Sequence, residues 1–363
     1  MEDFVYASKL HEAETRRVQL TGGATLIVSL PKEWTRQVNL KPGDEVLILP
    51  QPDKSLLIVP KRALKTPYLE VTVKLKEDVL RDPSKLERLL ISYYLSGVDL
   101  LKIELEEDMP EARRLIKKII REKLAGMEII EESREQLVLQ NLVSLADTDI
   151  NSLLLKMLKT VTNMLSDLRL AIERGDTLIL LDLVERDAEV DRFYWFIRRL
   201  LKKMLASGVF MILTSIRDPR SVIEYSTIGK MLERIADNIS EIAVELTTKV
   251  GDKINQIPND IRNQIVETLK KQQSQLESLM EYLSSKKLTL ENLNGIIETS
   301  RREIISKIEN ILSIIYSTAE FDRQLATTLR MIVYNLLRIS EYTIDVAEAF
   351  LDLMVDSMVT VKH

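Results

Sequence analysis

Four carboxylates in the third quarter of the sequence have the spacing of a shared helical face. Asp187 and Asp191 are four residues apart, and about one long helix later Glu233 and Asp237 repeat that spacing. Residues four apart lie one above the other on a helix, so two such helices packed side by side would gather all four carboxylates. Such a cluster repels itself unless a cation neutralises it. The four residues are therefore candidate ligands for a divalent or trivalent metal ion such as iron, zinc or magnesium.

The alternative is an exposed acidic face balanced by Arg186, Arg192 or Arg234, because surface charges at this spacing are common. The context of the two pairs counts against this alternative. Both pairs are flanked by apolar residues, namely Val184, Val190, Phe193, Leu232, Ile235, Ala236 and Ile239. The carboxylates would then lie at the edge of a buried stripe and not within an unbroken run of charge.

Length and composition place the chain among ordinary globular proteins with long helices. Its 363 residues have room for two or three domains, and 45% of them are apolar and 29% charged. Only 10 Gly and 10 Pro are present, which favours long helices over a loop-rich β protein. The formal net charge of −5 argues against a globally basic nucleic-acid binder but leaves room for a local basic patch.

Residue types that are missing exclude several kinds of chemistry. The chain has no cysteine, which removes disulfides, thiolate zinc sites and cysteine nucleophiles and fits a reducing cytoplasm. The two histidines, His11 and His363, lie near opposite ends of the sequence, so a histidine triad or a multi-histidine metal site is excluded. The acidic start lacks the apolar core of a signal peptide, and the apolar run at 208–216 is too short to span a bilayer. We expect a soluble, cytoplasmic protein without membrane insertion.

The first 145 residues predict two small domains. Residues 1–62 read as short strands at 15–20, 25–30, 45–49 and 56–59 with a brief helix at 31–38. Residues 67–145 alternate between strand and helix, which predicts a small α/β layer. Its expected strands are 69–75, 98–105, 127–130 and 136–143, and its expected helices are 83–95 and 110–125, the latter with Leu115, Ile119 and Ile120 inward. This layer contains no phosphate-binding loop and no glycine fingerprint.

From residue 147 to the end, the pattern is helical throughout. Gly, Pro and Asp breaks divide it into six long helices, arranged as three plus three. The predicted boundaries of the two three-helix bundles are 148–250 and 253–357. A weak internal repeat, in which residues 235–243 align with residues 339–347, supports this division.

The helical half resembles the PhoU family. The resemblance rests on Asp187–Asp191, on Glu233–Asp237 and on the stretch Leu232-Glu-Arg-Ile-Ala-Asp-Asn-Ile. It covers residues 148–357 and implies two tandem three-helix bundles, a role in regulating phosphate uptake, and metal binding through the carboxylates. The second bundle departs from the motif, because the residues at the matching positions are Arg301, Ile305, Leu337 and Glu341. The metal site is therefore expected only in the first bundle.

The N-terminal segment resembles the AbrB/SpoVT swapped-hairpin family. The residues that carry this resemblance are Arg17-Val18, Thr21-Gly-Gly23, Val28-Ser-Leu-Pro31 and Leu40-Lys-Pro-Gly-Asp44. It implies a homodimer that interleaves its hairpins and contacts DNA through Arg16, Arg17, Lys32 and Arg36. Six basic and three acidic side chains lie between Lys9 and Lys41, enough for a few phosphate contacts but not for a wide basic face.

Together these features predict a non-enzymatic regulator of phosphate uptake, of a type associated with archaea. Its dimeric head would bind DNA, its helical body would sense a metal or a partner, and the α/β layer would couple the two. The alternative is an adaptor that binds a phosphate transporter or a signalling kinase, with a head that only dimerises. A di-iron enzyme is disfavoured, because its usual Glu-x-x-His pairs need histidines that the helical body lacks before His363.

Overall fold

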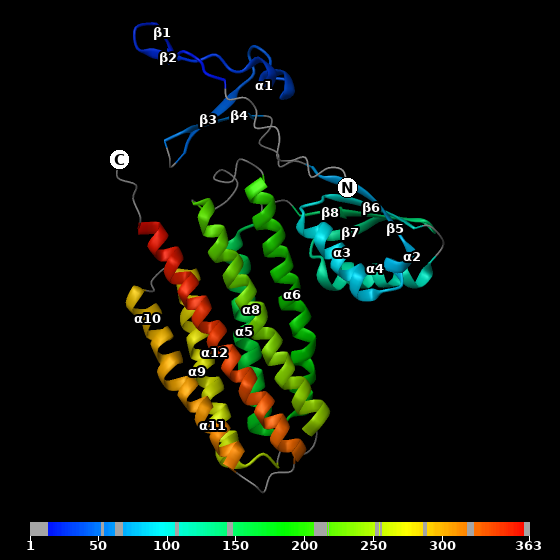
Figure 1. The fold of residues 1–363 in the computed structure, drawn as a ribbon, viewed down its shortest axis with the longest axis vertical. Coiled ribbons are helices and arrows are strands. Elements are labelled where there is room, and N and C mark those ends of the chain that lie inside the picture. Colours follow the sequence, from blue (N-terminus) through cyan, green and yellow to red (C-terminus); the bar gives the residue numbers. More distant parts are fainter. Residues whose placement is uncertain are drawn as a thin grey trace. The chain divides into compact units, whose positions relative to one another are not determined.

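The computed structural model divides the chain into two compact units, Met1–Thr66 and Pro67–His363 (Figure 1). The residues that the structure describes are 14–51, 54–61, 68–105, 109–143, 148–206, 216, 218–250, 254, 256–285, 289–317 and 323–358. His11, His363 and Lys9 lie outside these described residues.

The first unit contains two hairpins and a short helix. Strand β1 (Gln19–Thr21) pairs antiparallel with β2 (Thr25–Ile27), and β3 (Val46–Pro50) pairs antiparallel with β4 (Leu56–Pro60). Gly22 and Gly23 make the first turn with φ of 59° and 85°, a backbone region that glycine tolerates best. Helix α1 (Lys32–Gln37) follows Pro31. The first two strands are shorter than the predicted 15–20 and 25–30, because pairing within one chain ends at Gln19 and Ile27.

The first unit buries few of its apolar side chains. Every residue of β1 and β2 is exposed, and among the described residues of the unit only Val59 and Pro60 are buried. The large apolar side chains that it leaves exposed are Val18, Leu20, Leu26, Ile27, Val28, Ile48 and Leu56. A module of this size with so little burial does not have the core it would need for stability alone.

The second unit begins with an α/β layer whose sheet has the strand order β5-β6-β8-β7. The strands are β5 (Glu70–Leu75), β6 (Leu100–Leu105), β7 (Met127–Glu132) and β8 (Gln136–Asn141). The β5–β6 pair is parallel and the other pairs are antiparallel. A parallel pair needs a crossover connection, which here is made by α2 (Glu77–Leu80) and α3 (Pro83–Leu95). Helix α4 (Pro110–Lys123) joins them on the same face of the sheet (Figure 1).

Local signals explain the bounds of α3. Asp82 caps its first turn by accepting hydrogen bonds from the backbone N–H groups of Ser84 and Lys85. Pro83 occupies the first helical position, where its missing N–H costs nothing. Gly97, with φ of 85°, lies just beyond the last turn. The predicted range 83–95 is therefore confirmed.

The buried face of α4 differs from the prediction. Ile119 and Ile120 are buried as expected, but Leu115 is only half-buried and the fully buried neighbour is Ile116. The inward face runs through Ala112, Ile116 and Ile119, which are spaced by one helical turn, and Leu115 falls at its edge. The short helix α2 was not predicted; its four residues are too few for a periodic signal.

The rest of the second unit is helical and confirms the predicted layout of long helices in two groups of three. The first group is α5 (Ile150–Arg174), α6 (Thr177–Ala206) and α8 (Val222–Glu245), the last preceded by the 3₁₀ turn η2 (Pro219–Ser221) and followed by the π turn η3 (Leu246–Val250). The second is α9 (Asn259–Ser285), α10 (Leu290–Thr299) continued through the π turn η5 (Ser300–Ile304) into α11 (Ile305–Ser317), and α12 (Arg323–Met358). None of the described helices is both long and apolar enough to cross a membrane.

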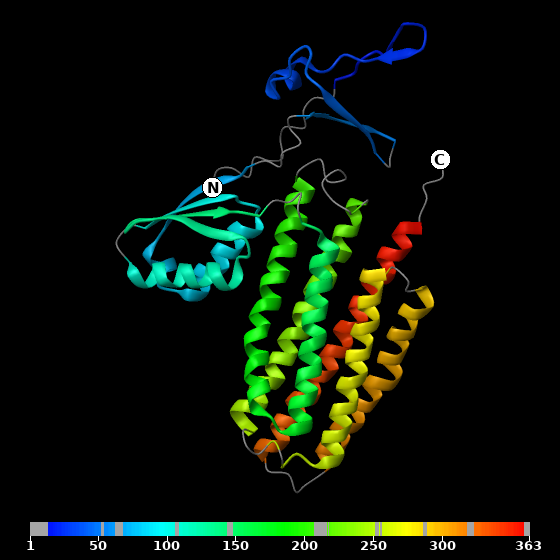
Figure 2. The same cartoon turned by 180° about the vertical axis from the view of Figure 1, so that it is seen from behind.

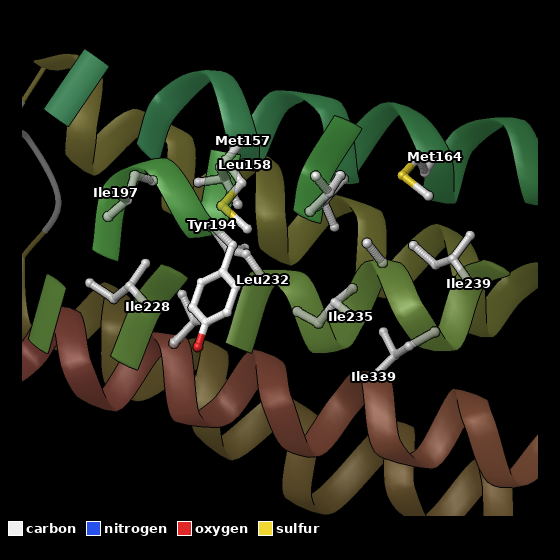
Figure 3. Packing of buried hydrophobic residues seen from close by; sticks show 14 of the residues in the cluster. Met157, Leu158, Met164, Tyr194, Ile197, Ile228, Leu232, Ile235, Ile239 and Ile339 are labelled. Atoms are coloured by element: carbon white, nitrogen blue, oxygen red, sulfur yellow. The ribbon is translucent and has the colours of Figure 1, made fainter. Parts of the chain in front are cut away.

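The two bundles share one apolar core. Helix α8 packs along α12, and α5 packs along α9, as both ribbon views show (Figures 1 and 2). Figure 3 shows Ile339 of α12 beside Ile235 and Ile239 of α8, and all three side chains are fully buried. On the other side of α8, Met157 and Leu158 of α5 complete the packing. This close packing holds α6, α8 and α12 in a constant mutual arrangement.

Candidate metal centre

Two neighbouring helices of the first bundle carry the four predicted ligands. Asp187 and Asp191 lie on α6, and Glu233 and Asp237 lie on α8, which packs against α6. Their orientation follows from the apolar residues next to them. The flanking side chains that are fully or almost fully buried are Leu183, Val190, Tyr194, Leu232, Ile235, Ala236 and Ile239. Because these side chains occupy the core, the carboxylates lie along the seam between the two helices.

Three of the four carboxylates converge. Asp191, Glu233 and Asp237 each offer an oxygen atom, and these atoms all lie within 4.8 Å of one another. Among the described residues, this is the one group of acidic side chains that meets so closely. Glu233 is only 6% exposed. Oxygen ligands at such separations can surround one hard cation at the usual bond lengths of about 2.0–2.6 Å, so the donor set fits a divalent or trivalent ion.

Asp187 lies next to this group, and its environment is unfavourable for a charge. Its Oδ1 atom is buried and has no hydrogen-bond partner. Burial, followed by the negative charges of Asp237 and Asp191, raises the pKa of Asp187 to about 7. Burial, followed by Glu233 and Asp191, also raises the pKa of Asp237 to about 6. Near neutral pH, Asp187 and Asp237 can therefore release a proton when a cation binds.

Basic side chains of the chain itself already reach the cluster. Lys123, at the end of α4 in the α/β layer, donates a hydrogen bond to Asp191 over 2.5 Å. Lys230 donates to both carboxylate oxygens of Glu233, each over 2.6 Å. A metal ion would have to compete with these ammonium groups. Lys230 could have been inferred from its spacing of three residues from Glu233, but Lys123 is 68 residues from Asp191 and has no local signal.

The three arginines proposed as counter-charges behave differently from one another. Arg186 pairs with Asp167 over 2.6 Å and also with Asp182, and so it neutralises other carboxylates. Arg192 is exposed. Arg234 reaches the cluster, with 3.4 Å between its Nη1 atom and Asp237 Oδ2. One of the three therefore contributes to balancing the cluster.

The corresponding region of the second bundle has a different composition. Arg301 pairs with Glu348 over 2.8 Å, and Glu341 pairs with Arg338 over 2.6 Å. Its buried polar layer is neutral: the side chain of Gln272 donates to Ser340 Oγ over 2.8 Å, and that of Gln275 donates to Ser300 Oγ over 2.8 Å. These amides and hydroxyls bond to one another without an ion, although the side-chain oxygen of Gln272 has no hydrogen-bond partner.

One buried arginine joins the α/β layer to the helix that carries Asp187 and Asp191. Arg199 of α6 is 2% exposed and donates to the carbonyl oxygens of Tyr94, over 2.5 Å, and Val98, over 2.9 Å. Its guanidinium also lies 3.4 Å from Asp99 Oδ1 and 4.9 Å from the centre of the Tyr94 ring. Lys203 pairs with the same carboxylate. The layer and α6 are therefore held together by charge-assisted hydrogen bonds as well as by apolar packing.

The predicted DNA-contacting residues lie in the first unit and are all exposed or partly exposed. Arg16 forms an ion pair with Glu14, and Arg36 pairs with Glu33 over 3.1 Å. Arg17 and Lys32 form no ion pair with the described part of the chain. Two of the four basic side chains therefore carry a charge that is not locally neutralised.

Replacing Asp187 by Asn is expected to stabilise the metal-free protein at pH 8 and to change little at pH 4. Because the folded-state pKa of about 7 lies above the ordinary 3.8, the folded protein keeps a proton that the unfolded chain releases in this window. The stability of the wild type should therefore fall as the pH rises from about 4 to 7, and the variant lacks this loss. Allowing for solvent screening, the free energy of unfolding of the variant at pH 8 should exceed that of the wild type by about 2 kcal/mol. Urea unfolding in chelator at several pH values measures it, and identical pH profiles would contradict the burial argument.

The fold and the carboxylate cluster together define a class of protein. Its members have a three-helix bundle with an acidic cluster, a second three-helix bundle, and a small hairpin domain that comes earlier in the sequence. Comparison with family models agrees. Residues 154–246 match the PhoU domain, and residues 19–66 match the antidote-toxin recognition protein MazE, a bacterial antitoxin. The chain thus carries a PhoU domain and, ahead of it, a MazE/AbrB-like domain. All four candidate ligands lie within the PhoU match, whereas of the four basic residues only Lys32 and Arg36 lie within the MazE match.

Among solved structures, the chain is similar to the phosphate transport system regulatory protein PhoU from Streptococcus pneumoniae. The two chains are 16% identical, with a TM-score of 0.47, and the similarity covers 59% of this chain and 96% of that one. A comparison with curated proteins found no match.

Proposed function

We propose that the protein is a non-enzymatic regulator of phosphate uptake that binds DNA as a dimer through its first unit and senses a metal ion or a partner through its helical region. The observation that carries the proposal is the joining of a MazE/AbrB-like domain to a PhoU domain whose matched segment contains the converging carboxylates. Both kinds of domain belong to regulatory families. The lack of histidine in the helical body before His363 removes the usual general base and agrees with a non-catalytic role.

Dimerisation is supported by the apolar side chains of the first hairpin. Leu20 and Leu26 are 66% and 68% exposed in a single chain, and they face each other across the β1–β2 pair. Exposed leucines on a two-stranded ribbon are an unstable arrangement that interleaving with a second copy would remove.

Changing both Leu20 and Leu26 to Glu in the full chain is therefore expected to convert the dimer to a monomer. The charges would face the apolar surface of the second copy without a partner, which costs far more than leaving two leucine side chains unburied. Light scattering coupled to gel filtration measures the mass. Ser274→Glu with Thr327→Glu adds the same charge to exposed positions of the second unit and should leave the dimer intact. A monomeric wild type would contradict the interleaved-hairpin model.

The cation that we propose for the helical region would be held by Asp191, Glu233 and Asp237, with Asp187 beside them. When bound, it would supply the positive charge that the cluster lacks. It would also compete with Lys123 for the negative charge of Asp191, because the metal ion and the ammonium group repel each other. Since Lys123 belongs to the α/β layer, this competition offers a physical route by which the layer responds to the cluster.

Binding to DNA by the first unit should depend strongly on Arg16 and Arg17. Replacing both by Ala is expected to weaken binding about tenfold. The slope of the logarithm of the binding constant against the logarithm of the salt concentration should become shallower by roughly 0.9 for each phosphate that the protein no longer neutralises. Gel retardation of the DNA upstream of phosphate-transport genes, repeated at several salt concentrations, gives both quantities. Arg302→Ala with Arg323→Ala removes two exposed arginines from the second unit and should change neither.

A second candidate function is an adaptor that binds a phosphate transporter or a signalling kinase, with a first unit that only dimerises. The observation in its favour is that Glu14 and Glu33 neutralise Arg16 and Arg36, two of the four basic candidates. Unchanged affinity and salt slope in the double Ala variant would favour the adaptor over the DNA-binding regulator.

A further inference from the structure

A groove of about 580 Å³ runs beside the candidate metal centre, between α8 and the second bundle. Asp187 of α6 and Asp237 of α8 line one part of it, and Glu241 and Glu245 continue the α8 wall. Met331 and Asn335 of α12 contribute the opposite wall. The groove thus depends on the packing of α12 against α8, which the ribbon views show as side by side (Figures 1 and 2).

Three buried polar side-chain atoms without a hydrogen-bond partner belong to residues that line this groove. They are Asp187 Oδ1, Glu245 Oε2 and Asn335 Nδ2. Asn335 is especially informative, because it is a neutral amide that is 2% exposed. A buried polar group without a partner is destabilising by about 1–3 kcal/mol, so three of them around one groove indicate a polar ligand. The amide of Asn335 can turn over to present its carbonyl oxygen, since oxygen and nitrogen occupy equivalent positions.

The carboxylates of the groove are arranged in a row and not around a point. Asp237, Glu241 and Glu245 follow one another at intervals of one helical turn, about 6 Å each. Glu241 and Glu245 do not join the group of oxygens that lies within 4.8 Å, although Asp237 does. Glu241 is exposed and forms no ion pair with the described residues, and Lys249 approaches only the Oε1 atom of Glu245, over 2.6 Å. Arg234 pairs with Asp237, so Glu241 and the Oε2 atom of Glu245 are the part of the row that a metal ion at the neighbouring centre would leave unpaired.

We propose that the groove binds a linear aliphatic polyamine, whose ammonium groups pair with Asp237, Glu241 and Glu245 and hydrogen-bond to the Asn335 side chain. Ammonium groups separated by three or four methylenes are about 5–6 Å apart, which matches one helical turn. The methylenes would lie on Val244 and Met331, which line the groove and are 39% and 40% exposed. The ligand is a free polyamine and not a lysine of another protein, because a lysine supplies one ammonium group and the row presents several carboxylates.

Isothermal titration of the full-length, chelator-treated protein with spermidine tests this. Spermidine should bind at physiological salt, and butylamine, with one ammonium group, should bind at least about tenfold more weakly. Glu241→Gln with Glu245→Gln, which keeps the shape of both side chains, should weaken spermidine binding by about tenfold or more. The control, Glu291→Gln with Asp352→Asn, removes two exposed carboxylates elsewhere in the second bundle and should change the affinity less than about twofold.

Met331→Lys gives a second test that does not disturb the core, because Met331 is partly exposed. Its tethered ammonium group should occupy the groove and exclude spermidine.

Two further variants distinguish binding at the metal centre from binding in the groove. Asp191→Asn with Glu233→Gln should abolish metal uptake and keep spermidine binding, while the Glu241 and Glu245 variant should keep metal uptake. Equal binding of butylamine and spermidine, or unchanged affinity in the Glu241 and Glu245 variant, would each overturn the proposal.

Discussion

Replacing Asp191 and Asp237 by Asn is expected to abolish metal uptake by the protein, lowering its affinity by roughly 100-fold or more. The two residues supply two of the three carboxylates that converge within 4.8 Å, and the remaining Glu233 cannot hold a hard cation alone. Removing two like charges should also leave the metal-free fold as stable as before or more stable, because burial and mutual repulsion hold the pKa of Asp237 at about 6. Elemental analysis and thermal melts with and without chelator measure both effects.

Two variants make this experiment specific. Glu341→Gln with Asp345→Asn removes carboxylates at the same four-residue spacing from α12, and metal uptake should be unchanged. Lys123→Met should shift the affinity in the opposite direction, because the ammonium group that pairs with Asp191 no longer competes. Equal metal content in the Asn variant and the wild type would mean that Lys123, Lys230 and Arg234 already neutralise these carboxylates and that the cluster does not bind the metal.

Much of the fold could be predicted because its signals are local. The start and end of α3 follow from Asp82, Pro83 and Gly97, which lie within or next to the helix. The long helices follow from an apolar period that repeats over many turns, and Gly175, with φ of 68°, ends α5 where a break was expected. The two strands of the first hairpin were predicted too long, because strand length depends on a pairing partner and not on the strand alone.

The candidate site was partly predictable for the same reason. The pairs on α6 and α8 have a spacing that the sequence reveals, and the structure brings three of these four carboxylates together. The contribution of Lys123 and the wall formed by Asn335 could not be predicted, since both come from elements distant in sequence that only tertiary packing places there. Nor did any pattern distinguish Asp187, whose Oδ1 atom has no hydrogen-bond partner, from Asp191 in the same helix, which pairs with Lys123.

Arg199→Met is expected to cause a large loss of stability for a single substitution, about 3 kcal/mol or more. Methionine fills a similar volume, so the cost comes from the lost charge-assisted hydrogen bonds to the carbonyl oxygens of Tyr94 and Val98. The Tyr94 oxygen would keep the bond that it accepts from the Gly97 N–H, whereas the Val98 oxygen would lose the guanidinium donor. Arg199→Lys should recover only part of the loss, because an ammonium group cannot reproduce the planar fork.

Urea unfolding and hydrogen exchange together locate this effect. Exchange should accelerate mainly where α3 ends and β6 begins, at residues 94–100, because these backbone groups surround the guanidinium. Arg192→Met, on the exposed side of the same helix, is the matched control and should change stability by less than about 0.5 kcal/mol. If both variants behaved alike, apolar packing and not Arg199 would hold the α/β layer against α6. The Lys123–Asp191 pair would then remain as the polar link through which a change at the acidic cluster of α6 could be transmitted to the layer.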